Sequence, residues 1–277
     1  MSQLKVFFLM AMMTVFLVLL GGFLGGPDMA MWFFAGAVVM NFGMFWFSDR
    51  MVLRMYKAKV IERDDAPQLF DMVDELRRKA DLPMPTVAIA PKEQPNAFAT
   101  GRSHKRAVVC VTAGLLKLMS RDELAGVIAH ELAHIKHRHM LVSTLGAVMA
   151  GAITMVARWG IFFGGGENRN PVVMILIMIL GPLAAIIIQM AISRTNEFQA
   201  DETGARIAGS PDGLANALQR LESAANRIPM DVNAAGAQLA IVNPLRGGAM
   251  GGMTKLFRTH PPTEDRIAAL RELRGTF

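Results

Sequence analysis

The chain has 277 residues, of which 52% are hydrophobic, and it carries a formal net charge of +6 and a single cysteine. One cysteine excludes a disulfide framework and favours a reducing compartment. The basic residues gather beside apolar runs, and the chain holds one tyrosine. The positive charge therefore indicates membrane topology, and no nucleic-acid partner is expected.

The first 47 residues contain two uncharged apolar runs, 6–24 and 29–47, joined by a Gly-Gly-Pro-Asp turn at 25–28. Each run matches the roughly 20 residues that a bilayer-spanning helix needs. A cleaved signal peptide is the alternative for the first run, but the run is long for that purpose and no small-residue cleavage site follows it. We expect a transmembrane hairpin over residues 1–48.

The charges around this hairpin predict its orientation, because the turn carries only Asp28. The basic residues that follow the second run are Arg50, Arg54, Lys57, Lys59 and Arg63. The positive-inside rule places the turn outside, and it places the N-terminus and the segment after residue 47 in the cytoplasm. We expect a multi-pass protein of the bacterial inner membrane whose soluble domain and two termini face the cytoplasm.

Residues 49–139 form the first part of the expected soluble domain. An amphipathic helix begins near Asp65 and is broken by the two prolines of 82–85. Short apolar runs then predict the strands of a small sheet, at 86–90, 96–101 and 106–112. Cys110 lies in the last run, so we interpret it as a buried strand residue and not as a catalytic thiol.

The next helix carries the motif H-E-x-x-H, at His130, Glu131 and His134. Residues four apart share a helix face about 6 Å apart along the axis, so the two imidazoles can bind one zinc ion. Glu131 lies beside them, where it can act as a general base. Ser120 and Glu123 have capping-box spacing and predict the helix start. The alternative is a helix that carries two histidines and no metal.

Residues 140–193 contain two further apolar runs, 140–159 and 171–193, which predict a second transmembrane hairpin. The first of them is the weaker span, and a buried helix of the soluble domain is its alternative. Either arrangement returns the chain to the same side of the membrane. Residues 194–277 then form the second part of the domain, with a loop expected in the Gly- and Met-rich stretch 245–253.

A catalytic zinc site needs a third protein ligand and an open position. Glu197 is the best candidate, because Asp201 follows one helical turn later and can accept the outer N–H of a histidine ligand. His137 lies about 10.5 Å along the axis from His130, too far to share its ion. His139 is expected on the opposite side of the helix, so we interpret both residues as polar groups at the membrane surface. Weaker candidates for the third ligand are Glu202 and Glu167.

Four motifs together make the sequence resemble the HtpX-type membrane-bound zinc metalloproteases and, more distantly, the CAAX prenyl proteases. They are N-A-F-A at 96–99, H-E-L-A-H at 130–134, S-R-T-N-E-F-Q-A-D at 193–201 and H-P-P-T-E-D-R at 260–266. The resemblance covers essentially the whole chain. It implies a mainly α membrane protein in which four transmembrane helices anchor an α+β gluzincin protease domain with a small β-sheet.

The resemblance also implies a role for each motif residue. The zinc ligands would be His130, His134 and Glu197, with Glu131 as general base and then general acid in the attack of a zinc-activated water on a peptide carbonyl. An edge strand that pairs with substrate would contain Asn96, Ala97 and Phe98. The residues that stabilise the oxyanion or bind substrate would be His260 and Arg266.

The function implied is endoproteolysis of misfolded or damaged membrane proteins at cytoplasmic segments, as part of a stress response. The expected cofactor is one Zn²⁺ per chain. The expected partners are membrane-protein substrates, the lipid bilayer and other quality-control proteases. Two alternatives stay open: a zinc-stabilised scaffold or chaperone, and an intramembrane protease, which the charges flanking the motif disfavour. A transporter is disfavoured because the apolar runs lack paired charges.

Overall fold

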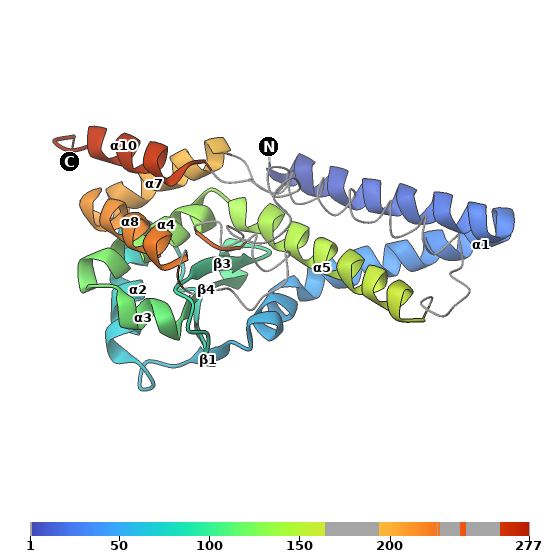
Figure 1. Cartoon of the computed structure of the whole chain (residues 1–277), viewed down its shortest axis with the longest axis horizontal. Helices are drawn as coiled ribbons and strands as arrows, with labels where there is room; N and C mark the ends of the chain where they lie inside the picture. The colour runs from blue at the N-terminus through green and yellow to red at the C-terminus, as the bar shows by residue number, and fades with distance from the viewer. Residues whose placement is uncertain (1, 164–193, 226, 228–238, 242–260, 277) are drawn as a thin grey trace.

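The computed structural model describes residues 2–163, 194–225, 227, 239–241 and 261–276. Long helices extend to one side of a mixed α/β domain, and the C-terminus lies at the opposite end (Figure 1). Four sequence predictions lie outside the described residues: the ligand candidate Glu167, the fourth apolar run at 171–193, the loop at 245–253 and the position of His260.

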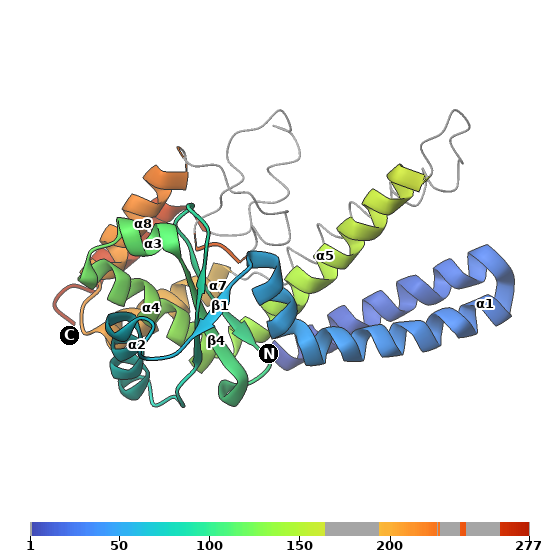
Figure 2. The same ribbon diagram turned by 90° about the horizontal axis from the view of Figure 1, so that it is seen from below.

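The two N-terminal apolar runs form a helical hairpin, α1 (Ser2–Tyr56). Gly25 and Gly26 leave the helical conformation at the predicted turn, and Gly26 adopts φ +71°, a conformation that favours glycine. The two arms lie side by side (Figures 1 and 2). Leu4–Phe23 and Gly25–Tyr56 are long and apolar enough to cross a bilayer. The second arm continues as a helix beyond the apolar run, as far as Tyr56.

Large apolar side chains of this hairpin point away from the protein. Examples with their exposed fractions are Phe7 71%, Leu19 68%, Phe23 74%, Trp32 76% and Val39 72%. Apolar surface of this extent is unfavourable in water and favourable against lipid. The polar Asn41 is buried instead, and its side-chain amide donates to the Met10 carbonyl (3.1 Å) and to Thr14 Oγ1 (2.8 Å) on the other arm.

The sheet has four strands in the order β1-β2-β4-β3. Their bounds are β1 Lys59–Ile61, β2 Thr86–Ala90, β3 Ala97–Gly101 and β4 Ala107–Thr112. β2 and β4 are parallel, and the two outer pairings are antiparallel, so β3 lies at an edge. The three predicted strands are confirmed to within one residue. The sequence did not predict β1, because three residues in a charged stretch show no alternation.

Successive side chains along the strands point to opposite faces of the sheet. One face packs against α2 and α4 through Val87, Ala99, Val109 and Val111. The other face packs against α1 and α5 through Ala88, Phe98, Val108 and Cys110. Since both faces are covered, β3 and β4 are buried along their whole length. Cys110 is fully buried, which confirms its prediction as a strand residue.

The helices of the α/β domain gather around α4, and a 3₁₀ turn, η1, precedes β4 (Figure 1). Their bounds are α2 Pro67–Lys79, η1 His104–Arg106, α3 Ala113–Leu118, α4 Arg121–Lys136, α7 Arg194–Ala208, α8 Asp212–Ala225 and α10 Thr263–Glu272. Glycines let α8 lie directly on α4, because an added Cβ at Gly126 would overlap the backbone of Leu214.

The third apolar run forms α5 (His139–Phe163), which leaves the domain alongside α1 (Figures 1 and 2). Its first part, His139–Ile153, is apolar and mostly buried against α1 and the sheet. This part packs between the apolar hairpin and the sheet, and the span expected at 140–159 stays a prediction. It also anchors the hairpin to the domain, next to the end of the motif helix.

Candidate metal centre

The motif helix α4 starts at the predicted capping box. The backbone N–H of Ser120 donates to Glu123 Oε2 (2.8 Å), and the N–H of Glu123 donates to Ser120 Oγ (3.4 Å). Such a cap contributes about 1 kcal/mol and fixes where the helix begins. The helix then presents His130 and His134 one turn apart, with Nε2 atoms separated by 3.1 Å.

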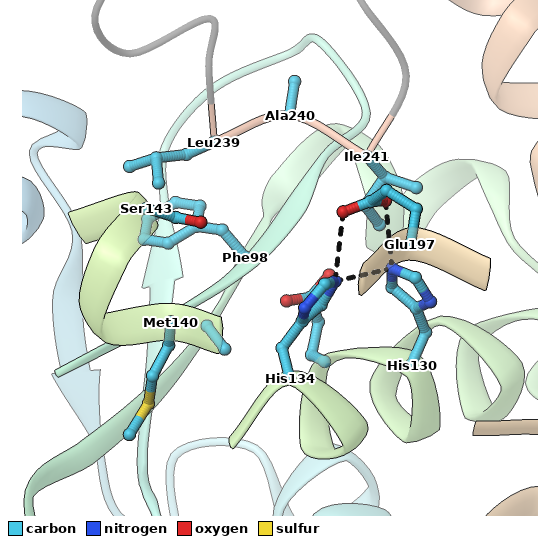
Figure 3. A pocket seen from close by; sticks show the side chains of 11 residues that line it. Phe98, His130, His134, Met140, Ser143, Glu197, Leu239, Ala240 and Ile241 are labelled. Carbon is cyan, nitrogen blue, oxygen red and sulfur yellow. Dashed lines mark hydrogen bonds and ion pairs between the residues drawn. The ribbon is translucent and has the colours of Figure 1, made fainter. Parts of the chain in front are cut away.

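Helix α7 brings Glu197 to these two histidines because it packs closely on α4. A Cβ added to Gly204 would lie 2.9 Å from the Cα and N atoms of His130, so only glycine fits there without displacement. Glu197 Oε2 lies 3.8 Å from His130 Nε2, and Oε1 lies 3.6 Å from His134 Nε2 (Figure 3). The structure thus brings together the three residues that the sequence proposed as ligands.

The three side chains fit a metal ion. One potential ligand atom from each lies within 4.8 Å of the others. Ligands bound tetrahedrally at about 2.0–2.1 Å are about 3.3 Å apart, close to the separations of 3.1–3.8 Å between these donors. Two imidazoles and one carboxylate also form a donor set that catalytic zinc uses, with one position left open.

Asp201 lies behind His130, on the side away from Glu197. Its Oδ1 is 3.0 Å from His130 Nδ1, and both side chains are almost completely buried. Arg266 from α10 contacts the same carboxylate with two nitrogens, Nε at 2.8 Å and Nη2 at 2.7 Å. Burial by itself would raise the pKa of Asp201, but the guanidinium of Arg266 and the imidazole of His130 hold it below its ordinary value.

Arg266 joins three segments of the chain. Besides Asp201, its Nη1 donates to the Ile241 carbonyl (3.0 Å) and lies 3.5 Å from Glu197 Oε2. The side chain is 1% exposed and does not line the cavity beside the histidines. This position differs from the expectation that Arg266 contacts substrate. The sequence did not predict the pairing of Arg266 with Asp201, because no local pattern connects residues that are 65 positions apart.

Glu131 lies in the same cavity and is 4% exposed. Burial raises the pKa of Glu131 to about 7, although His130 and a hydrogen bond with the main chain of Ala99 oppose the shift. A carboxyl group with a pKa near neutrality can both accept and return a proton at physiological pH. Glu131 is thus a buried carboxyl group that lines the same cavity as the three grouped donors.

The cavity is walled mainly by apolar side chains (Figure 3). They come from β3, from α5 and from a tripeptide, and they are Phe98, Ala99, Met140, Leu239, Ala240 and Ile241. Asn96 is 1% exposed, and its Oδ1 accepts from the Ile241 N–H (3.2 Å), so Asn96 holds the tripeptide in place. Ala97 is fully buried. The tripeptide carries no motif, so the sequence did not predict its place at the site.

His139 occupies a different place from the one predicted. Helix α4 ends at Lys136, Arg138 adopts φ +59°, and α5 begins at His139. The expectation that His139 faces away was wrong, because it assumed a continuous helix. The ring is 8% exposed, with its Nδ1 3.2 Å from His134 Nδ1, and burial lowers the pKa of His139 to about 4. His137 instead contacts Thr203 Oγ1 through Nε2 (2.9 Å).

Comparison with known proteins agrees with this geometry. The sequence profile of peptidase family M48 matches residues 63–274. A protein described as "Protease HtpX homolog" from Gemmatimonas aurantiaca is 53% identical over 99% of both chains, and one from Salinibacter ruber is 55% identical over 96% of both. This chain belongs to peptidase family M48. As an M48 protein with an apolar hairpin, it is a membrane-associated metalloprotease.

A solved structure shares the fold of this M48 protein. The crystal structure of S. mikatae Ste24p superposes with a TM-score of 0.52 at 19% sequence identity. The likeness covers 93% of the present chain and 61% of the Ste24p chain. At this level of identity the comparison supports the architecture, and it does not transfer the activity of the larger protein.

Proposed function

We propose that this chain is a membrane-anchored, zinc-dependent endopeptidase that cleaves misfolded or damaged membrane proteins at their cytoplasmic segments. The proposal rests on one observation: the side chains of His130, His134 and Glu197 lie close together, next to the buried carboxyl group of Glu131. Membership of family M48 supports the protease activity. The choice of zinc, the substrates and the orientation in the membrane are our inference.

In this proposal, His130, His134 and Glu197 hold the zinc ion. When bound, zinc supplies Lewis acidity that polarises a carbonyl oxygen and lowers the pKa of a water at its open position towards ~7. Glu131 accepts a proton from the attacking water and delivers it to the leaving amine. Asp201 and Arg266 keep the His130 ring oriented, and His260 is proposed to stabilise the oxyanion.

The edge strand β3 is proposed to align the substrate. The Asn96 carbonyl accepts from the Thr112 N–H (2.9 Å) and therefore faces β4. Because backbone groups alternate along a strand, those of Ala97 and Ala99 face the outer edge. An extended substrate segment can add to this edge as a further strand. Phe98 would then contact a substrate side chain within the apolar part of the cavity.

The proposed substrate class follows from where the site lies on the chain. Helix α5 begins three residues after the end of the motif helix and packs along the apolar hairpin. A site so placed lies close to the bilayer surface and reaches loops or tails of membrane proteins. Cleavage inside the bilayer is disfavoured, because Lys136 and Arg138 are exposed next to the site and charges are costly in hydrocarbon. Other membrane quality-control proteases are the proposed functional partners.

Removal and return of metal tests the proposal directly. We expect the purified full-length protein to contain close to one zinc ion per chain and to cleave a membrane-protein substrate with an unfolded cytoplasmic tail. A chelator should abolish cleavage, and Zn²⁺ should restore it where Mg²⁺ does not, because imidazole donors favour zinc. Zinc-loaded protein that cleaves no such substrate would instead support the scaffold alternative.

The orientation of the protein in the membrane can be tested by labelling introduced cysteines. The native cysteine should react little with the label. Cys110 is fully buried, and burial raises the pKa of its thiol to about 12. In intact cells freed of their outer membrane, an impermeant maleimide should label Asp28→Cys at the hairpin turn. Lys105→Cys, on an exposed part of the domain, should react only after the membrane is permeabilised. The opposite pattern would refute the cytoplasmic assignment.

A further inference from the structure

The chain turns sharply between the motif helix and α5. A continuous helix would place His139 about 140° around the axis from His134, since each residue turns the helix by about 100°. Helix α4 ends at Lys136 instead, and the positive φ of Arg138 reverses the path. The His139 ring returns to His134, with the ring centroids 5.4 Å apart and the Nδ1 atoms 3.2 Å apart.

The two nitrogens of His134 have different surroundings. Nε2 faces His130 Nε2 (3.1 Å) and Glu197 Oε1 (3.6 Å), in the space where a metal fits. Nδ1 points the other way, towards His139. A histidine that binds a metal through Nε2 carries its proton on Nδ1 and needs an acceptor for it. Within the described part of the chain, His134 Nδ1 lies within hydrogen-bonding distance of His139 Nδ1.

The surroundings of His139 favour an acceptor at that atom. The His139 ring also interacts with the side chain of Gln199, on α7, whose amide oxygen is able to accept an N–H. A neutral imidazole has one N–H and one bare nitrogen. If the N–H of His139 is directed at Gln199, its Nδ1 is left bare and can accept the proton of His134. The His137 ring stacks on the His139 ring, with centroids 5.4 Å apart, and its Nε2 contacts Thr203 Oγ1.

We propose that His139 is a positioning residue of the metal centre: its Nδ1 accepts the Nδ1–H of His134 and so holds Nε2 of His134 towards the metal. This inference rests on the proposed use of His134 as a ligand. The two histidine ligands then have different outer partners, a carboxylate (Asp201) for His130 and an imidazole for His134. Since His139 is also the first residue of α5, the position of that helix is coupled to the geometry of the site.

The test compares two substitutions of His139 with a neighbouring control. His139→Leu removes the acceptor, whereas His139→Asn retains one, because the Asn Oδ1 lies as many bonds from Cα as the imidazole Nδ1. His137→Leu removes the stacked imidazole but leaves the His134–His139 contact. The readout is zinc affinity of the full-length protein in detergent, by competition with a chromophoric chelator. We expect His139→Leu to bind zinc about 10–100-fold more weakly, with His139→Asn and His137→Leu close to wild type.

The visible spectrum of the Co²⁺-substituted protein provides a second readout, because it reports ligand geometry at the metal. The spectrum should change in His139→Leu and return towards wild type in His139→Asn. The inference is overturned if His139→Leu binds zinc as tightly as wild type, or if His139→Asn is folded but fails to restore affinity and spectrum. If His139→Leu does not fold, the inference is tested by the zinc affinity and the Co²⁺ spectrum of His139→Asn, which should both match wild type. Wild-type protein that binds zinc but cleaves nothing refutes the proposed function and leaves this inference standing.

Discussion

Replacing Glu131 with glutamine is expected to leave zinc bound and to reduce peptide-bond cleavage by roughly 10²–10⁴-fold, the range that general acid–base catalysis supplies. Glutamine keeps the size of the side chain and loses the group that accepts the proton. The metal should remain, because the three grouped donors are His130, His134 and Glu197. Cleavage of a membrane-protein substrate and zinc content, measured on the same preparation, check both halves of the expectation.

A matched control shows whether an effect of Glu131→Gln comes from the loss of a proton acceptor or only from the loss of one negative charge. Glu202→Gln, also on a helix near the site, alters a carboxylate that is 52% exposed and paired with Arg206. This variant should retain both zinc and cleavage. Full cleavage by Glu131→Gln would rule out Glu131 as the proton carrier. Loss of zinc from Glu131→Gln would show that the residue acts on the metal site itself.

Replacing Arg266 with alanine is expected to have the largest effect on stability, about 3–5 kcal/mol. The substitution leaves the carboxylate of Asp201, 2% exposed, buried without its cation. It also removes the donor to the Ile241 carbonyl, which holds the tripeptide wall of the cavity. Urea unfolding of zinc-free protein in detergent measures the change without a contribution from lost metal.

The matched control for Arg266 is Arg274, two residues after the end of α10. Arg274 Nε lies 2.6 Å from Asp212 Oδ1, but the two side chains are 56% and 48% exposed. Exposed pairs contribute only about 0–1 kcal/mol, because water screens them. Arg274→Ala should therefore unfold close to wild type. Equal effects of the two substitutions would show that the burial of Arg266 does not govern its contribution.

Features that depend on short spacings could be predicted from the amino-acid sequence. The period of the helix placed His130 and His134 on one face, and the Ser120–Glu123 cap marked where that helix begins. The glycines at 25–26 marked the hairpin turn, and short apolar runs marked three of the four strands. These patterns are readable because backbone geometry repeats every few residues, so neighbouring positions in the chain report on the same element.

The surroundings of the three grouped donors could not be predicted, because they depend on how distant segments fold together. The pairing of Arg266 with Asp201 joins residues 65 positions apart, and the tripeptide 239–241 contacts Asn96 from 145 positions away. A single positive φ at Arg138 brings His139 back to His134, against the direction that the helical period predicts. Contacts of this kind depend on how separate elements pack, and packing has no period in the sequence from which to read it.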